Sequence, residues 1–127
     1  MQEEPELIAA EPQLFVPDLA AACAYYVDRL GFTLAFEHGD PPFYAQVRRG
    51  GVRLNLRHSD GAVFAEDFRD REEDALSATV TVKGIEPLFQ SFDLAGVAWH
   101  QRLRSEPWGA RTFIVRDPGG NLIAFVE

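Results

Sequence analysis

Residues 106–127 decide the fold, and they read EPWGARTFIVRDPGGNLIAFVE. β-Branched, aromatic and long side chains alternate over residues 111–116, which is typical of a strand. The next five residues, 117–121, predict a turn, because proline presets φ, glycine accepts positive φ, and Asp and Asn side chains bond to nearby backbone. Residues 122–126 then form the returning strand, so the sequence predicts a β-hairpin.

The first half of the chain is expected to contain a strand, a helix and three further strands. The first strand is predicted over 7–16, with Pro12 at an edge or a bend because proline cannot donate a ladder hydrogen bond. Asp18 is a helix N-cap candidate and Gly31 a helix terminator. The apolar stripe of this helix consists of Leu19, Cys23, Tyr26 and Leu30, and the following strands are expected over 32–37, 43–48 and 52–57.

The second half repeats this order of elements. A strand is expected over 76–83, a helix between Gly84 and Gly96, and a strand over 97–103 before the hairpin. Leu19 of the first helix corresponds to Ile85 of the second, and Tyr26 corresponds to Phe92. The mixed-charge stretch 59–75 is predicted to be a linker within one domain, between a first module over 7–58 and a second over 76–127.

Composition limits the classes of function. The 127 residues carry a formal net charge of −8, which argues against nucleic acid as a partner. No apolar run of about 18 residues or more suggests a membrane partner, and the acidic N-terminus lacks the layout of a secretion signal, so we expect a cytoplasmic protein. Cys23 is the single cysteine; it excludes an internal disulfide and is expected to pack in the core.

Three motifs carry a resemblance to a known family. They are Pro107-Trp108-Gly109, the turn 117–121, and the run from Asp18-Leu19 to Leu30-Gly31-Phe32. Together with the repeat, they resemble the glyoxalase/bleomycin-resistance superfamily, the vicinal oxygen chelate fold, and its bleomycin-resistance branch in particular. The resemblance implies an α+β fold in which two βαβββ modules form curved mixed sheets around a cleft. It also implies a homodimer, with or without exchange of the N-terminal strand across Pro12.

Enzymes of this superfamily hold a divalent metal with His and Glu side chains from four strands. The resemblance places those positions near Glu11, Asn55, Ser77 and Ala124. Only Glu11 is a good ligand, and transition metals need several imidazole, carboxylate or thiolate donors. His38, His58 and His100 fall at none of these positions. We therefore expect no metal, no cofactor and no catalytic residues.

The resemblance therefore favours a bleomycin-resistance-like binding protein, which sequesters an antibiotic or similar aromatic ligand in a cleft without chemistry. Stacking on a flat ligand requires aromatic side chains, and hydrogen bonding requires polar ones. For each aromatic residue the alternative is packing in the core. The candidates for the cleft are Trp108, Trp99, Phe36, Phe43, Tyr44, Asn55, Arg57, Arg111 and Phe113.

Three arginines are the feature of the sequence that does not fit this function. Arg53, Arg57 and Arg111 would disfavour a cationic drug if they faced the cleft, and would favour an anionic ligand. They would instead pair with carboxylates if they lay at the outer surface. The alternatives to drug sequestration are a metal-dependent lyase, isomerase or dioxygenase of the same superfamily, and a sensor of small ligands.

Overall fold

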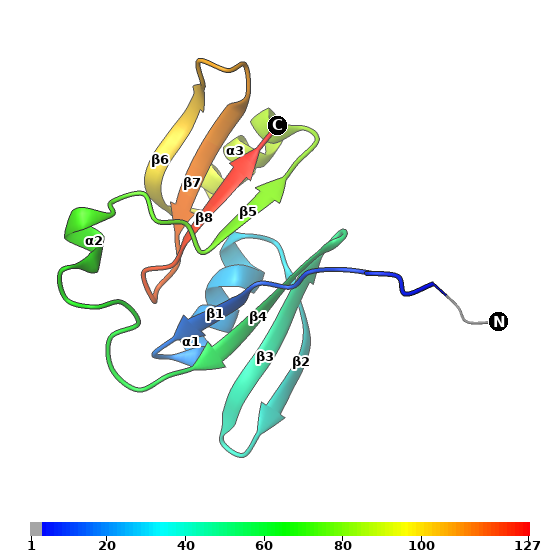
Figure 1. Ribbon diagram of the computed structural model, residues 1–127, viewed down its shortest axis with the longest axis vertical. Coiled ribbons are helices and arrows are strands. Elements are labelled where there is room, and N and C mark those ends of the chain that lie inside the picture. Colours follow the sequence, from blue (N-terminus) through cyan, green and yellow to red (C-terminus); the bar gives the residue numbers. More distant parts are fainter. Residues whose placement is uncertain (1–3) are drawn as a thin grey trace.

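The computed structural model describes residues 4–127 and contains two four-stranded sheets, one from each half of the chain (Figure 1). The strand orders are β1-β4-β3-β2 and β5-β8-β7-β6. In each sheet the first strand pairs in parallel with the last, and the remaining pairs are antiparallel. The elements are β1 (Gln13–Val16), α1 (Leu19–Ala24), η1 (Tyr25–Arg29), β2 (Thr33–Gly39), β3 (Pro42–Arg49), β4 (Val52–His58), α2 (Phe68–Arg71), β5 (Ala78–Thr81), α3 (Ile85–Leu94), β6 (Ala98–Ser105), β7 (Arg111–Arg116) and β8 (Leu122–Val126).

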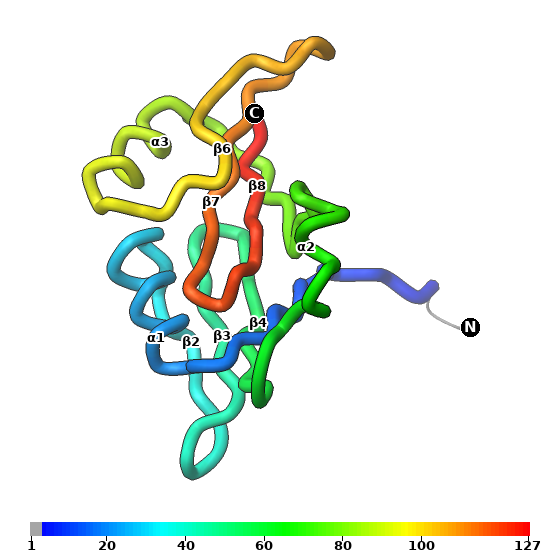
Figure 2. Tube along the Cα trace, turned by 90° about the vertical axis from the view of Figure 1, so that its left-hand side faces the viewer, coloured from blue at the N-terminus to red at the C-terminus, as the bar shows by residue number. Residues whose placement is uncertain are grey.

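This arrangement confirms the expected fold of two βαβββ modules. Helices α1 and α3 lie on the same side of the molecule (Figure 2). Each helix covers one face of its own sheet because its apolar stripe must be buried. The opposite face of each sheet carries the candidate site. In the part of the chain that the structure describes, no helix is long and apolar enough to cross a membrane.

The first helix begins and ends where the sequence predicts. The Asp18 carboxylate accepts a hydrogen bond of 3.0 Å from the Ala21 N–H, and Gly31 has a φ of +72°. Between them, α1 continues as the π-helical turn η1, Tyr25–Arg29. A π-turn accommodates one extra residue in a helix. In the repeat, Tyr26 corresponds to Phe92, which is 66 residues later, whereas Gly31 corresponds to Gly96, which is only 65 residues later. The difference of one is the extra residue that the π-turn places between Tyr26 and Gly31.

The turn at 117–121 is built as its composition predicts. The Asp117 carboxylate accepts hydrogen bonds from the backbone N–H groups of Gly119 at 2.9 Å and Asn121 at 2.8 Å. The Tyr26 hydroxyl donates to the same carboxylate at 2.9 Å, which joins the second hairpin to the first helix. Burial raises the pKa of Asp117, and the donated hydrogen bonds oppose that rise.

One apolar core extends through both modules. Tyr26 and Leu54 of the first half and Phe92, Phe113 and Phe125 of the second belong to the same buried cluster, on the helix-facing sides of the sheets. Aromatic rings of the second half pack edge to face around Phe92, with centroid distances of 5.7 Å to Phe113 and 5.4 Å to Phe125. The two modules therefore share their core.

The N-terminal strand is shorter than predicted. Residues 7–12 do not belong to β1; residues 7–9 extend away from the sheets (Figure 1), and Leu7 and Ile8 are 97% and 80% exposed. The ladder stops at Pro12, where the carbonyl still accepts from the Asn55 N–H at 3.0 Å. Beyond this point no neighbouring strand of the described chain continues the pairing.

The linker contains a short helix, α2, that its charge pattern did not predict. Two half-buried aromatic residues stack there, Phe64 and Phe68, with ring centroids 6.1 Å apart. Arg69 lies over the Phe64 ring at 4.4 Å and donates to the Gly120 carbonyl at 3.0 Å. These contacts tie the linker to the β7–β8 turn, although most of its side chains are exposed.

Candidate functional site

The candidate site is the face of the first sheet that α1 leaves uncovered. Along β3, Ala45 and Val47 are buried towards the helix, so Tyr44, Gln46 and Arg48 point the other way. Registered partners share a face, and the pairings between β1, β2, β3 and β4 therefore define this open face. Its residues are Gln13, Phe15, Thr33, Phe36, His38, Tyr44, Gln46, Arg48, Arg53, Asn55 and Arg57.

The centre of the open face is a fixed polar group. The Gln46 amide Nε2 donates to Glu11 Oε1 and to Asn55 Oδ1, both at 3.0 Å. The other carboxylate oxygen of Glu11 lies 3.6 Å from Arg53 Nη1. These interactions hold side chains from three segments in one arrangement, because each long side chain has a hydrogen-bonding partner. A ligand placed here meets preorganised polar atoms.

The end of the open face nearest the β2–β3 turn is aromatic. Phe36 and Tyr44 stack with ring centroids 6.0 Å apart and planes inclined by 22°. Phe43 lies beside them against His38, and the Arg57 guanidinium is 6.0 Å from its ring centroid. Phe36 and Phe43 are 44% and 41% exposed. A flat ligand can stack here, since the rings present apolar surface to solvent.

Positive charge lies at both ends of the open face: Arg57 is registered with Tyr44 at the aromatic end, and Arg48 and Arg53 lie at the end nearest the β3–β4 turn. Arg48 and Arg53 stand opposite each other across β3 and β4, where like charges repel. Within residues 4–127, Arg53 pairs with Glu11, whereas Arg48 and Arg57 form no ion pair. The open face is therefore locally cationic, although the whole chain carries a net charge of −8.

The corresponding face of the second sheet has a different chemistry. Its centre is a separate buried apolar cluster of Ile114, Leu122 and Ala124. Beside it, the Gln101 amide donates to Thr112 Oγ1 at 2.9 Å, and the Thr112 hydroxyl donates to Glu106 at 2.8 Å. Hydrogen bonds from Arg104 and Thr112 lower the pKa of Glu106. In the single chain the apolar cluster is therefore buried, and the Glu106 carboxylate lies beside it.

Three residues predicted for the cleft lie on the helix-facing side instead. Phe113 is fully buried in the core. Trp99 packs against Phe89 with centroids 4.8 Å apart, and Arg111 pairs with Glu86 of α3 at 2.9 Å. Residues 111, 113 and 115 share a face, and α3 covers that face. The alternation along this strand predicts two faces without specifying which one the helix takes.

The other predicted residues have different placements. The open face brings together Phe36, Tyr44, Asn55 and Arg57, with Phe43 at its edge. Trp108 lies in the loop between β6 and β7 and is 75% exposed. It remains a candidate for a stacking contact, since its ring is accessible.

Sequence reasoning missed Gln46, which bridges Glu11 and Asn55, and Arg48 and Phe15 on the same face. The signal was present in β3. Ala45 and Val47 are small apolar residues at alternate positions, and the polar residues between them must face outwards. Phe15 is harder to predict, because an aromatic residue next to a buried strand position usually packs in the core.

The superfamily metal positions do not form a suitable donor set. Glu11 and Asn55 lie together, but the Gln46 amide occupies an oxygen of each. Ser77 donates to Asn121 at 2.7 Å, and Ala124 has no donor atom. In residues 4–127, no three His, Cys, Asp or Glu side chains cluster as metal ligands would. The residues present do not fit a divalent transition metal, which prefers several nitrogen, sulfur or carboxylate donors.

Comparison with known proteins gives a consistent result. The family "Glyoxalase/Bleomycin resistance protein/Dioxygenase superfamily" matches residues 8–125. A bleomycin resistance protein of Geobacillus stearothermophilus is 29% identical over 135 residues, covering 95% of this chain and 97% of the relative. A bleomycin resistance protein of Staphylococcus aureus is equally similar.

Solved structures share the fold. A bleomycin-binding protein from Streptomyces verticillus, solved with copper(II)-bleomycin, is 26% identical and has a TM-score of 0.74, covering 96% of this chain and 97% of the other. TioX from Micromonospora sp. ML1 is 23% identical with a TM-score of 0.73, covering 92% and 95% of the two chains.

Proposed function

Because this chain belongs to the glyoxalase/bleomycin resistance protein/dioxygenase superfamily, we propose that it is a binding protein that sequesters a bleomycin-type antibiotic or a similar aromatic ligand. The observation that carries the proposal is the exposed Phe36–Tyr44 stack beside the fixed group of Glu11, Gln46 and Asn55. The nearly full-length similarity to bleomycin resistance proteins supports it. The donor set described above does not favour the metal-dependent enzyme.

Binding without chemistry needs only surface that complements the ligand. The stacked rings offer an apolar plane for a flat heteroaromatic group, and the Gln46 amide holds Glu11 and Asn55 ready for polar groups. Preorganisation favours affinity, because little side-chain freedom is lost on binding.

A direct test is titration of the full chain with copper-loaded and with metal-free bleomycin, followed by heat and by tryptophan fluorescence. We expect saturable binding at one site per subunit. Tyr44→Ala should weaken binding by about tenfold or more, because it removes one ring of the stack. Leu94→Ala is the matched control, since Leu94 is 91% exposed on α3. Undiminished affinity in Tyr44→Ala would contradict this placement of the ligand.

The open face lacks an opposite wall in the single chain, and we propose that a homodimer supplies it. Two observations support the dimer. Residues 4–9 extend away from their own sheets, and Leu7 and Ile8 expose apolar side chains there. Exchange of this segment across Pro12 would bury both side chains and cover an edge of the partner's sheet. The face of the second sheet that carries Gln101, Thr112 and Glu106 then forms the other wall of a shared cleft.

Light scattering coupled to size-exclusion chromatography tests the dimer. We expect a mass of about twice the 14.2 kDa of one chain. The double change Leu7→Asp and Ile8→Asp should shift the protein towards the single-chain mass, because it places charge where burial is required. A single-chain mass for the unmodified protein would exclude the shared cleft.

The arginines support a second candidate, an anionic aromatic ligand. Arg48 and Arg57 have no ion-pair partner within residues 4–127, and a carboxylate or phosphate would supply one. Matched cationic and anionic aromatics should therefore be compared in the unmodified protein and in Arg57→Ala. If only the anions bind, and Arg57→Ala abolishes that binding, sequestration of a cationic antibiotic is excluded.

A further inference from the structure

The internal repeat creates two junctions at which a hairpin turn of one module meets the helix of the other. At the first junction, the β7–β8 turn meets Tyr26. At the second, the β3–β4 turn lies near Phe92, the counterpart of Tyr26. The turns differ in length: residues 117–121 connect the last pair of β7 and β8, whereas only Gly50 and Gly51 connect the last pair of β3 and β4.

The longer turn fills the first junction. The Tyr26 hydroxyl donates to Asp117 at 2.9 Å. A Cβ placed on Gly119 would lie 3.2 Å from Pro17 and 3.4 Å from Val16, so the turn is in tight contact with the end of β1. Backbone and side chains leave little room at this junction.

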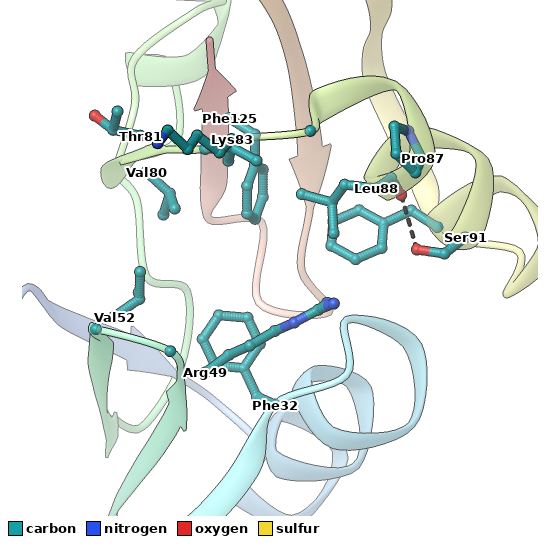
Figure 3. A pocket seen from close by; sticks show the side chains of 15 residues that line it. Phe32, Arg49, Val52, Val80, Thr81, Lys83, Pro87, Leu88, Ser91 and Phe125 are labelled. Atoms are coloured by element: carbon teal, nitrogen blue, oxygen red, sulfur yellow. Dashed lines mark hydrogen bonds between the residues drawn. The ribbon is translucent and has the colours of Figure 1, made fainter.

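The shorter turn leaves the second junction open. A cavity of about 590 Å³ lies between the β3–β4 turn and the segment that joins β5 to α3. Val82 and Lys83 line it, and these are the counterparts of Val16 and Pro17. Figure 3 shows Phe32, Val52, Val80, Leu88 and Phe125 around its apolar interior. Its size is typical of a small-molecule site.

Two cationic side chains border this apolar interior. Arg49 extends across the cavity beside Phe32 (Figure 3), and its Nη1 donates to the Leu30 carbonyl at 2.7 Å. This bond orients the guanidinium and leaves its other N–H groups for a ligand. Lys83 lies at the rim, close enough to Glu127 to help lower the pKa of that carboxyl. Neither Arg49 nor Lys83 forms an ion pair in residues 4–127.

The Glu127 carboxylate, which lies close to Lys83, already accepts hydrogen bonds. Glu127 accepts from the backbone N–H groups of Gly84 at 3.1 Å and Ile85 at 2.9 Å, at the start of α3. It is therefore held at the start of α3, and it forms no ion pair with Arg49. The cavity therefore combines apolar walls with two cationic side chains at its border, and Arg49 has no ion-pair partner in residues 4–127.

We propose that this junction cavity binds a small hydrophobic anion, such as an aromatic or short aliphatic carboxylate. The apolar body lies against Phe32, Leu88 and Phe125, and the carboxylate is held by the free N–H groups of Arg49. The site is independent of the proposed antibiotic cleft. Val80 and Phe125 belong to the helix-facing core of their sheet, whereas the cleft residues lie on the open faces.

The test compares naphthalene-2-carboxylate with the neutral 2-naphthylmethanol, using amide NMR spectra of the full chain. We expect the carboxylate to shift the Gly50, Gly51 and Gly84 amide signals, whereas any shifts at Tyr44 or Asn55 report binding at the separate open face. The alcohol should bind about tenfold more weakly or worse, because it forms no charge-assisted hydrogen bond. Absence of shifts at all three glycines at millimolar carboxylate, or shifts confined to the open face, would overturn the proposal.

Two variants make the test specific. Leu88→Trp should abolish the shifts because the larger side chain fills the cavity, and Leu94→Trp on the exposed side of the same helix should preserve them. Arg49→Met should lower carboxylate affinity about tenfold and leave the alcohol unaffected. Equal losses for both probes in Arg49→Met would contradict the assigned role of Arg49. Bleomycin titration of Leu88→Trp separates the two sites, since the proposed cleft remains intact in that variant.

Discussion

At the residue scale, Tyr26 and Tyr25 are neighbours with opposite hydrogen-bonding states. The Tyr26 hydroxyl bonds to Asp117, whereas the buried Tyr25 hydroxyl has no partner among residues 4–127. Tyr26→Phe should lower the free energy of unfolding by about 1–2 kcal/mol, because a buried acceptor loses a donor. Denaturant titration at neutral pH measures this loss.

Tyr25→Phe is the matched control. It removes the same atom from the adjacent position, but that atom makes no hydrogen bond. We expect unchanged or slightly increased stability, since an unpaired buried hydroxyl is unfavourable. Equal destabilisation by the two changes would mean that the Tyr26–Asp117 bond does not join the modules energetically.

The sequence predicted much at this scale. Asp18 as an N-cap and Gly31 as a helix end were predicted correctly, because both depend on local backbone chemistry. The sequence did not predict that Trp99, Phe113 and Arg111 lie on the helix-facing side of the second sheet. An alternating strand presents the same pattern to either side, and only the packing of α3 decides which side is buried.

At the element scale, the Glu127 carboxylate caps the start of α3. Hydrogen bonds from the Ile85 and Gly84 N–H groups lower its pKa below the ordinary value of 4.5. A carboxyl group whose pKa is lowered on folding stabilises the folded state above the unfolded pKa, and this stabilisation is lost as pH falls through the folded pKa. The cap should therefore weaken progressively below about pH 4.5.

Glu127→Gln tests this dependence because an amide does not titrate. At pH 7 the unmodified protein should be the more stable of the two, and the difference should shrink towards pH 3. Thermal unfolding at both values measures the change. A difference that stays constant across this range would exclude the carboxylate as the source of the stabilisation.

The order of the elements was predictable, and their ends were less so. The predicted first strand over 7–16 is wrong for residues 7–12, since β1 has only four paired residues, Gln13–Val16. The apolar residues in this range indicated a strand, but a strand also needs a neighbouring strand with which to pair. The short α2 helix was missed for a related reason: Phe64 and Phe68 acquire their packing only against each other and the β7–β8 turn.

At the scale of the whole molecule, the shared core predicts one cooperative transition. Leu54 of the first module lies in the same cluster as Phe92 and Phe125 of the second, and both tryptophans belong to the second module. Leu54→Ala should lower the free energy of unfolding by about 2–5 kcal/mol. Because the modules share one core, tryptophan fluorescence should report this loss as fully as circular dichroism does.

An exposed counterpart is the control for this change. Leu34→Ala alters an apolar side chain of the same module that is 39% exposed, so its effect should be smaller. Separate transitions by the two optical signals in Leu54→Ala would indicate that the modules unfold independently.

The projecting N-terminal segment also has a consequence for proteolysis. Proteases bind their substrates as extended chains, and residues 4–12 are extended and largely exposed. Leu7 and Phe15 both suit chymotrypsin, but Phe15 is held in β1. Within the N-terminal segment, cleavage should therefore occur first after Leu7, and its rate at increasing protein concentration would record how far a second subunit shields the segment.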